Sequence, residues 1–258
     1  MHGLQERHES AKSAGIIETL SGDAAMKKSL CIETMFGDAP FAERFAKTRA
    51  AGFDFVEFSD WTNLDITRAG ELLLENRLAL TSISGARNHF LDDPDQREDF
   101  LEFLSQSIAV AKSFACSNIV VACESGSGGR APIIDALTAA SRKTARAGMT
   151  LLVRPDTAGS GDRACGPQSI GDAVNALSSP SLRLLYETRR DGDADETALD
   201  TLRKYRDVVA YIRVCGDPDT YSRLRRALTE ELDYNGVVGF RIDTVGREER
   251  CLEAIRNF

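Results

Sequence analysis

Short apolar runs alternate with amphipathic stretches along most of this chain. Each run is rich in Val, Ile, Leu or aromatic residues and is apolar nearly throughout, which is typical of strands buried on both faces of a parallel sheet. The predicted strands cover residues 29–34, 54–58, 78–83, 117–122, 150–154, 182–187, 209–214 and 236–241.

The stretches between these runs repeat their apolar residues at the spacing of one helix face. The repeats are Phe41 with Phe45; Phe100, Leu104 and Ile108; Ile134 with Leu137; and Tyr221, Leu224, Leu228 and Leu232. Strands alternating with helices in this way predict an α/β fold, a single (β/α)8 TIM barrel, for which about 250 residues are typical. A doubly wound sheet is the alternative, and the lack of a G-x-G-x-x-G motif after the first strand weakens it.

Composition and charge narrow the classes of partner. The 258 residues carry a formal net charge of −8, which argues against nucleic acid because a phosphate backbone requires a basic surface. No apolar run approaches the roughly 20 residues that span a membrane, and the N-terminus lacks the apolar core of a signal peptide. We therefore expect a cytoplasmic protein without a membrane partner; a homo-oligomer is allowed by the sequence but not required.

Residues 1–25 differ from the rest of the chain. They are polar apart from a weak apolar patch at Ile16, Ile17 and Leu20. We expect an N-terminal tail or short extra helix over residues 1–25 and a TIM-barrel domain over residues 26–258.

The cysteines give no sign of a metal site. They stand at positions 31, 116, 123, 165, 215 and 251, without a C-x-x-C pair and without neighbouring clusters of histidine. Reduced thiols are the expectation for a cytosolic protein.

Nearly every predicted strand has a charged residue at or just after its carboxyl end, where a barrel builds its active site. In chain order these residues are Glu33, Glu57, Arg87 with Asn88 and His89, Glu124, Arg154, Glu187, Arg213 and Arg241. A single charge at a strand end is most often a solvated rim residue. A charge on almost every strand is more than a structural barrel needs, so we interpret the group as a candidate site.

Five of these residues lie within or directly after apolar runs and are expected to be buried. They are Glu57, Arg154, Glu187, Arg213 and Arg241. Buried arginines need partners, and three arginines against two glutamates leave room for an anion. His89 is a candidate general base on a loop. For Glu33, Glu124, Asp156 and Asp243, a solvated position at the rim is the more common outcome.

Several segments resemble a known family. They are "MFGDAPFAERFAKTRAAGFDFVEF" at residues 35–58, "ARAGMTLLVRP" at 145–155, "SPSLRLLYET" at 179–188, "YIRVCGDPD" at 211–219 and "LDYNGVVGFRID" at 232–243. From about residue 29 to residue 242 the chain resembles the xylose isomerase-like TIM-barrel superfamily, most closely its hydroxypyruvate isomerase branch. The resemblance implies a (β/α)8 barrel and proton-transfer chemistry next to a carbonyl group.

The resemblance also implies a divalent metal, and here the chain departs from the family. The family's ligands are a glutamate ending strand five, an aspartate ending strand six, a glutamine or histidine on strand seven and a glutamate ending strand eight. The matching residues are Arg154, Glu187, Arg213 and Arg241, and the family's histidine after the aspartate is matched by Arg190. A guanidinium has no lone pair to offer a cation, so we expect no metal and no other cofactor.

Three hypotheses follow. In the first, the protein is a metal-independent isomerase, epimerase, cyclase or lyase that acts on a small anionic metabolite, with arginines supplying the positive charge of the lost metal. Its candidate catalytic residues are Glu57, Glu187 and His89, and its candidate substrate-binding residues are Arg154, Arg213, Arg241, Glu33 and Glu124. In the second, the protein is a catalytically inactive binding or partner subunit whose charges form a salt-bridge plug. In the third, a metal binds through the glutamates at positions 33, 57, 124 and 187.

Overall fold

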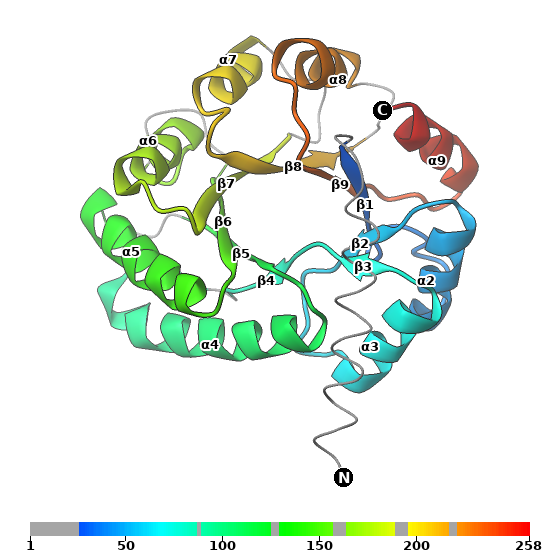
Figure 1. Ribbon diagram of the computed structural model, residues 1–258, viewed down its shortest axis with the longest axis horizontal. Helices are drawn as coiled ribbons and strands as arrows, with labels where there is room; N and C mark the ends of the chain where they lie inside the picture. The colour runs from blue at the N-terminus through cyan, green and yellow to red at the C-terminus, as the bar shows by residue number, and fades with distance from the viewer. Residues whose placement is uncertain (1–25, 87–88, 125–128, 157–163, 189–195, 217–220) are drawn as a thin grey trace.

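The predicted strands form one ring of parallel strands with helices around its outside (Figure 1). The computed structural model describes residues 26–86, 89–124, 129–156, 164–188, 196–216 and 221–258. In these residues the strands are β1 (Lys27–Cys31), β2 (Phe55–Glu57), β3 (Ala79–Leu80), β4 (Ile83–Ser84), β5 (Asn118–Ala122), β6 (Thr150–Arg154), β7 (Leu182–Glu187), β8 (Val209–Cys215) and β9 (Val237–Arg241).

The third apolar run closes the ring, because its first part pairs with the preceding strand and its second part pairs with the following strand. The order of neighbouring strands is β3-β2-β1-β9-β8-β7-β6-β5-β4. β3 pairs with β2 and β4 pairs with β5, all in parallel. Because β3 and β4 are two parts of the run at 78–83, these strands occupy eight positions of a TIM barrel, and the predicted fold is confirmed.

The helices follow the strands in the expected alternation. They are α2 (Phe41–Ala50), α3 (Ile66–Glu75), α4 (Arg97–Ser113), α5 (Arg130–Arg146), α6 (Pro167–Leu177), α7 (Glu196–Lys204), α8 (Ser222–Arg226) and α9 (Glu248–Asn257). None of the helices in the described residues is long and apolar enough to cross a membrane.

Two helical details differ from the sequence pattern. In α5 the predicted residue Leu137 is fully buried, but its buried isoleucine partner is Ile133, one turn earlier, whereas Ile134 is only half-buried. The last apolar stripe does not form one regular helix. α8 continues as a π-helical segment, η3 (Ala227–Glu231), which widens the turn while Leu224 and Leu228 stay in the core.

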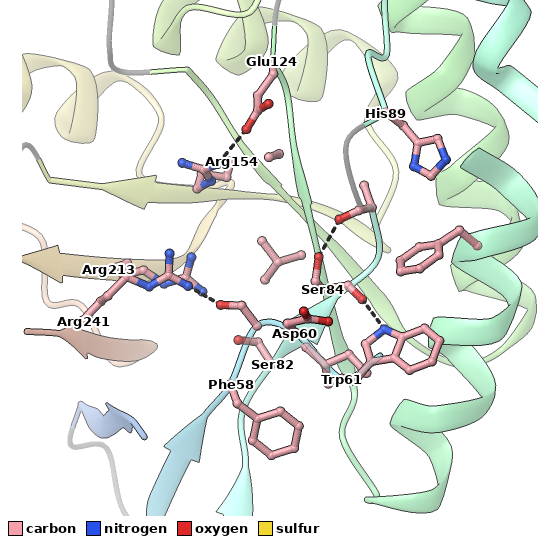
Figure 2. Close-up of a pocket in the computed structure, with 16 residues that line it drawn as sticks. Phe58, Asp60, Trp61, Ser82, Ser84, His89, Glu124, Arg154, Arg213 and Arg241 are labelled. Atoms are coloured by element: carbon pink, nitrogen blue, oxygen red, sulfur yellow. Dashed lines mark hydrogen bonds and ion pairs between the residues drawn. The ribbon is translucent and has the colours of Figure 1, made fainter. Parts of the chain in front are cut away.

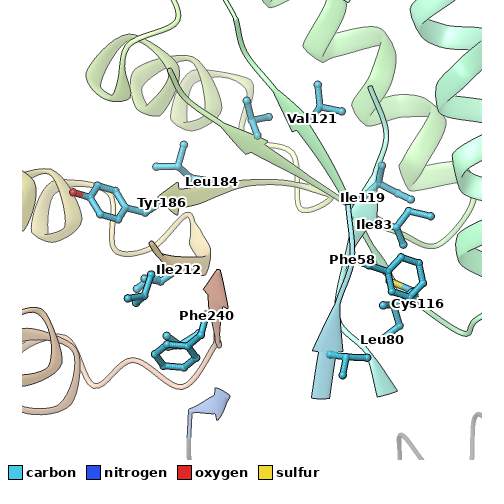
Figure 3. Close-up of a cluster of buried hydrophobic side chains, with 14 of the residues drawn as sticks. Phe58, Leu80, Ile83, Cys116, Ile119, Val121, Leu184, Tyr186, Ile212 and Phe240 are labelled. Atoms are coloured by element: carbon cyan, nitrogen blue, oxygen red, sulfur yellow. The ribbon is translucent and has the colours of Figure 1, made fainter. Parts of the chain in front are cut away.

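Two apolar layers hold the barrel together. The larger lies between the strands and the helices, and Figure 3 shows part of it, including Ile119 and Val121 of β5 and Leu184 of β7. The smaller layer fills the interior of the ring. It consists of Val120, Leu152, Leu185 and Tyr211, from four successive strands. This interior layer closes the barrel below its carboxyl end, so it is a packed core and not a channel.

Candidate active site at the carboxyl end of the barrel

The charged strand ends follow from the alternation of side chains along each strand. Residues two apart point to the same side of a strand. The interior apolar layer consists of Val120, Leu152, Leu185 and Tyr211. Two positions further along the same strands lie Ala122, Arg154, Glu187 and Arg213. The barrel interior therefore changes from an apolar layer to a charged layer toward the carboxyl ends of its strands.

The deepest part of the charged layer is an ion pair between Glu57 of β2 and Arg213 of β8. Arg213 Nε donates to Glu57 Oε1 and Arg213 Nη2 to Glu57 Oε2, both at 3.0 Å. The Tyr211 hydroxyl donates to the same Oε2 at 2.6 Å, and Ser82 Oγ does so at 3.3 Å. Only 2% of the Glu57 side chain and 4% of the Arg213 side chain are exposed. The sequence prediction that both residues are buried is confirmed.

The surroundings of Glu57 keep its carboxylate ionised. Burial alone would raise the pKa of Glu57, but the charge and hydrogen bonds of Arg213, with Arg241 and the Tyr211 hydroxyl, hold that pKa below its ordinary value. Burial and the charge of Glu57 raise the pKa of Tyr211 well above its ordinary value, so its hydroxyl remains a hydrogen-bond donor. Both oxygens of Glu57 are thus engaged by protein donors.

This arrangement predicts a loss of stability in acid. The pKa of Glu57 is lower in the folded protein than in the unfolded chain, where it is about 4.3. Its stabilising contribution is therefore complete above that unfolded value and is lost as the pH falls through the lower folded value. Urea unfolding from neutral pH to about pH 3 should show a steeper fall for the wild type than for Glu57→Gln. Parallel curves for the two proteins would contradict the assignment.

The ion pairing continues outward from Arg213 as a chain. Arg213 Nη1 lies 3.3 Å from Glu187 Oε2, and Arg154 Nη1 lies 3.0 Å from Glu187 Oε1. Arg154 Nη2 then lies 3.5 Å from Glu124 Oε1. The exposed fraction of the side chain rises along this chain, from 12% for Glu187 to 24% for Arg154 and 58% for Glu124. Arg154 and Arg213 are therefore neutralised within the protein.

Arg241, at the end of β9, differs from the other two arginines. Its Nη2 donates to Ser59 Oγ. Within the described part of the chain, no carboxylate lies at ion-pair distance from its half-buried side chain. A guanidinium carries five N–H donors, so Arg241 retains charge and hydrogen-bonding capacity for another group.

A cavity of about 330 Å³ lies over the charged layer (Figure 2). Of the residues selected from sequence, its described lining includes Arg154, Arg213, Arg241, Glu124 and His89. The volume is at the lower end of the range for small-molecule sites. The cavity therefore has the size and the position of a barrel active site.

Three other candidates lie near the cavity without belonging to its described lining. Glu57 and Glu187 are held behind the arginines that they bind. Glu33 follows β1, and its Oε1 accepts a hydrogen bond from the Asp60 backbone N–H at 2.9 Å. The candidates at positions 87, 88, 189 and 190 fall outside the described residues, as does the segment 1–25.

Sequence reasoning missed the part of the lining that follows β2. Ser59, Asp60 and Trp61 come shortly after this strand and line the cavity together with Phe103 of α4. The signal was available in "SDWTN" at residues 59–63, where the only tryptophan of the chain adjoins an aspartate at a strand end. A pattern of charged strand ends does not mark Ser59 or Trp61, which carry no charge, and Asp60 lies two residues beyond the predicted end of the strand.

The described residues at the barrel mouth do not fit a metal. Among the residues that the structure describes, no group of three or more His, Cys, Asp or Glu side chains is arranged to hold a metal ion. The two carboxylates of the charged layer, Glu57 and Glu187, are both bound by Arg213. A cation at this position would have to displace a guanidinium from between them.

One expectation about the cysteines is wrong. Cys123, directly after β5, and Cys165, shortly before α6, form a disulfide with their Cα atoms 5.4 Å apart. Reduced thiols were expected because the sequence was interpreted as that of a cytosolic protein. The two residues are 42 positions apart in the sequence. The fold brings them together beside the cavity, where the Cys123 N–H donates to the Arg154 carbonyl at 2.8 Å.

The thiols nearest the charged layer are not suited to nucleophilic chemistry. Burial, with the charge of Glu57, raises the pKa of Cys31 to about 11. Burial, with the charge of Glu187, raises the pKa of Cys215 to about 12. Both groups therefore remain thiols at neutral pH, and a thiolate is the reactive form of cysteine.

Comparison with solved structures finds similar barrels. An AP endonuclease of family 2 from Brucella melitensis is 19% identical with a TM-score of 0.77, covering 90% of this chain and 99% of that one. A 3-keto-D-glucoside 4-epimerase from E. coli is 16% identical with a TM-score of 0.71, covering 90% and 100%. A D-psicose 3-epimerase from Clostridium cellulolyticum H10 is 15% identical with a TM-score of 0.66, covering 90% and 92%. At these identities the likeness concerns the fold.

Comparison of sequences identifies the family. No curated protein matches this sequence. The family model described as xylose isomerase-like TIM barrel matches residues 45–190, which is more than half of the chain and runs from α2 past the end of β7. The chain therefore belongs to the xylose isomerase-like TIM barrel family.

Proposed function

We propose that the cavity binds a small anionic metabolite through Arg241, and that the protein is a metal-independent enzyme of the sugar isomerase or epimerase type. The observation that carries the proposal is the unequal use of the three arginines. Arg154 and Arg213 bind glutamates, whereas Arg241 lines the same cavity with no carboxylate at ion-pair distance among the described residues. A carboxylate or phosphate matches the donors that remain.

The type of reaction is supported by relatives. Two of the structural neighbours are named as epimerases that act on sugars, and the segments quoted above resemble the hydroxypyruvate isomerase branch. Metal independence is supported by the residues at the positions of that branch's ligands, where three of four are arginines. In the proposed site Arg241 stabilises the negative charge that develops on the substrate oxygen when a neighbouring proton leaves.

The roles of the other candidates follow from their contacts. Glu57 is a positioning residue, because Arg213 and Tyr211 engage its oxygens and it holds Arg213 at the cavity. Proton transfer falls to a side chain that lines the cavity, and we assign it to His89. Glu187 lies behind Arg154 and orients it.

Calorimetric titration with inorganic phosphate and with glycerate, on protein treated with a chelator, tests the proposal. Arg241→Ala should weaken anion binding about tenfold to a hundredfold, because it removes a charge-assisted contact worth roughly 1.5–3 kcal/mol. The exposed Arg142 of α5 provides a matched control, and Arg142→Ala should bind as the wild type does. Equal binding by Arg241→Ala and the wild type, or no binding of either anion, would refute the proposal.

A second candidate function is an inactive binding or partner subunit. The observation that favours it is the continuous ion-pair chain from Glu57 to Glu124, which has the form of an internal salt-bridge plug. Proton exchange separates the two functions. In D₂O, an enzyme of the proposed type incorporates solvent deuterium next to the carbonyl group of a bound keto acid, whereas a binding subunit leaves that position unlabelled.

A further inference from the structure

We infer that the ligand of this cavity is a carboxylate carried on a flat aromatic body, and not a polyhydroxylated sugar acid. The protein would then share the proton-transfer chemistry of the sugar isomerases and epimerases but not their sugar substrates. The inference rests on the proposed binding of an anion at Arg241 and specifies the rest of the ligand. It is carried by the opposite walls of the cavity, which differ in chemistry. Figure 2 shows Arg213 and Arg241 on one side of the cavity and Trp61 and His89 on the other.

The wall opposite the arginines is a fixed aromatic surface. The ring of Trp61 stacks on Phe103, with ring centroids 5.3 Å apart and an interplanar angle of 28°. His89 contacts Phe103 in turn, with centroids 5.9 Å apart. A flat ring of a ligand gains most from such a surface, because offset stacking adds to the burial of apolar area.

Hydrogen bonds hold the indole of Trp61 in place. Its N–H lies 3.1 Å from the Ser84 carbonyl oxygen and 3.2 Å from Ser107 Oγ. The polar edge of the ring is therefore satisfied by the protein, and a ligand meets only its apolar surface. The neighbouring lining adds Ile83, Val120 and Ala122, which are apolar as well.

The serine hydroxyls and the Asp60 carboxylate of the lining are already engaged. Ser82 donates to Glu57 and Ser84 donates to the Ala86 carbonyl. Ser59 accepts from Arg241. Asp60 Oδ1 accepts from the Thr62 N–H and hydroxyl, and its Oδ2 accepts from the Asn63 amide.

A ligand with many hydroxyl groups would need a partner for each group on entering the cavity, and every unpaired buried hydroxyl is costly. A ligand with one anionic group and an apolar body needs only the donors of Arg241 and the aromatic wall. The cavity, at about 330 Å³, is large enough for a ligand that contains one ring.

The chain supplies its own reporter for a test. Trp61 is the only tryptophan in the sequence and lines the cavity, so a change in tryptophan fluorescence reports on this site. The probes are benzoate, cyclohexanecarboxylate and glucuronate, which share a single carboxylate but carry a flat ring, a puckered ring and a polyol. We expect benzoate to bind about three- to tenfold more tightly than cyclohexanecarboxylate, and glucuronate to bind most weakly.

Two variants assign the contacts by calorimetry. Phe103→Leu keeps an apolar side chain but removes the ring under Trp61, and should reduce the preference for benzoate while leaving phosphate affinity unchanged. Arg241→Ala should weaken all the anions together. Thermal melts of both variants identify any that fail to fold, in which case Phe103→Met and Arg241→Lys replace them.

The outcomes separate this inference from the proposed function. Binding of glucuronate or phosphate through Arg241, without a preference for benzoate, would overturn the inference of an aromatic ligand. The proposed binding of anions at Arg241 would still stand. Failure of every anion to bind, or binding that Arg241→Ala does not weaken, would overturn both.

Discussion

Replacing Arg213 with alanine is expected to lower the free energy of unfolding by about 3–5 kcal/mol. The guanidinium of Arg213 makes two hydrogen bonds to Glu57 and a third contact to Glu187. Without it, the buried carboxylate of Glu57 would keep only the hydroxyl donors of Tyr211 and Ser82. A buried charge that loses its partner is among the most destabilising changes in a protein. Chemical denaturation measures the loss.

Two further variants show whether the cause is the stranded charge. Arg154→Ala should cost less, because 24% of this side chain and 58% of its partner Glu124 are exposed to solvent. Adding Glu57→Gln to Arg213→Ala should recover part of the loss, since the double variant no longer buries an unpaired carboxylate. A loss below about 1 kcal/mol for Arg213→Ala, or a double variant less stable than Arg213→Ala, would show that the pair does not form as described.

Gly85→Ala should destabilise the fold by about 1–3 kcal/mol, toward the upper end of that range. A Cβ at Gly85 would lie 2.2 Å from Ile119 Cγ2, 3.0 Å from Leu104 Cδ1 and 3.4 Å from Val121 Cγ2. The backbone cannot withdraw, because the Gly85 N–H donates to the Val120 carbonyl at 2.7 Å. The close approach of β4 to β5, which completes the ring, therefore depends on the missing side chain. Thermal or chemical unfolding gives the measurement.

The same substitution in a helix provides the control. Gly70 lies inside α3, and a Cβ there would meet Phe114 Cε1 at an ordinary contact distance of 3.7 Å. Gly70→Ala should therefore stabilise the protein by about 0.5–1 kcal/mol, through the lower conformational entropy of the unfolded chain. Equal stability of Gly85→Ala and the wild type would mean that the chain at Gly85 packs less closely against β5 than in this structure.

The fold was predictable from sequence because its signals are local. Apolar runs and helical stripes need only neighbouring residues, and all eight predicted strands occur in the structure within a few residues of their expected ends. The strand predicted at residues 78–83 is also present, although it is divided into β3 and β4. Burial of Glu57 and Arg213 was predictable for the same reason, since both lie within apolar runs.

The candidate site was predictable only in part. Strand ends of a parallel barrel meet at one face, so the charged residues of that face could be named, and Arg154, Arg213, Arg241, Glu124 and His89 do line one cavity. The aromatic wall was missed, because Phe103 lies on α4 and carries no charge that marks it. The disulfide between Cys123 and Cys165 was missed because nothing local marks residues that meet only after folding.

The sequence by itself determined the barrel and the presence of charge at its mouth, because apolar runs, helical stripes and strand order depend on neighbouring residues. Only the tertiary structure decided which charges neutralise each other. Glu57 and Arg213 are 156 positions apart and meet across the barrel, while Arg241 on the adjacent strand pairs with a serine. Ion pairing depends on distances of a few ångströms between strands remote in sequence, and residue order alone does not specify those distances.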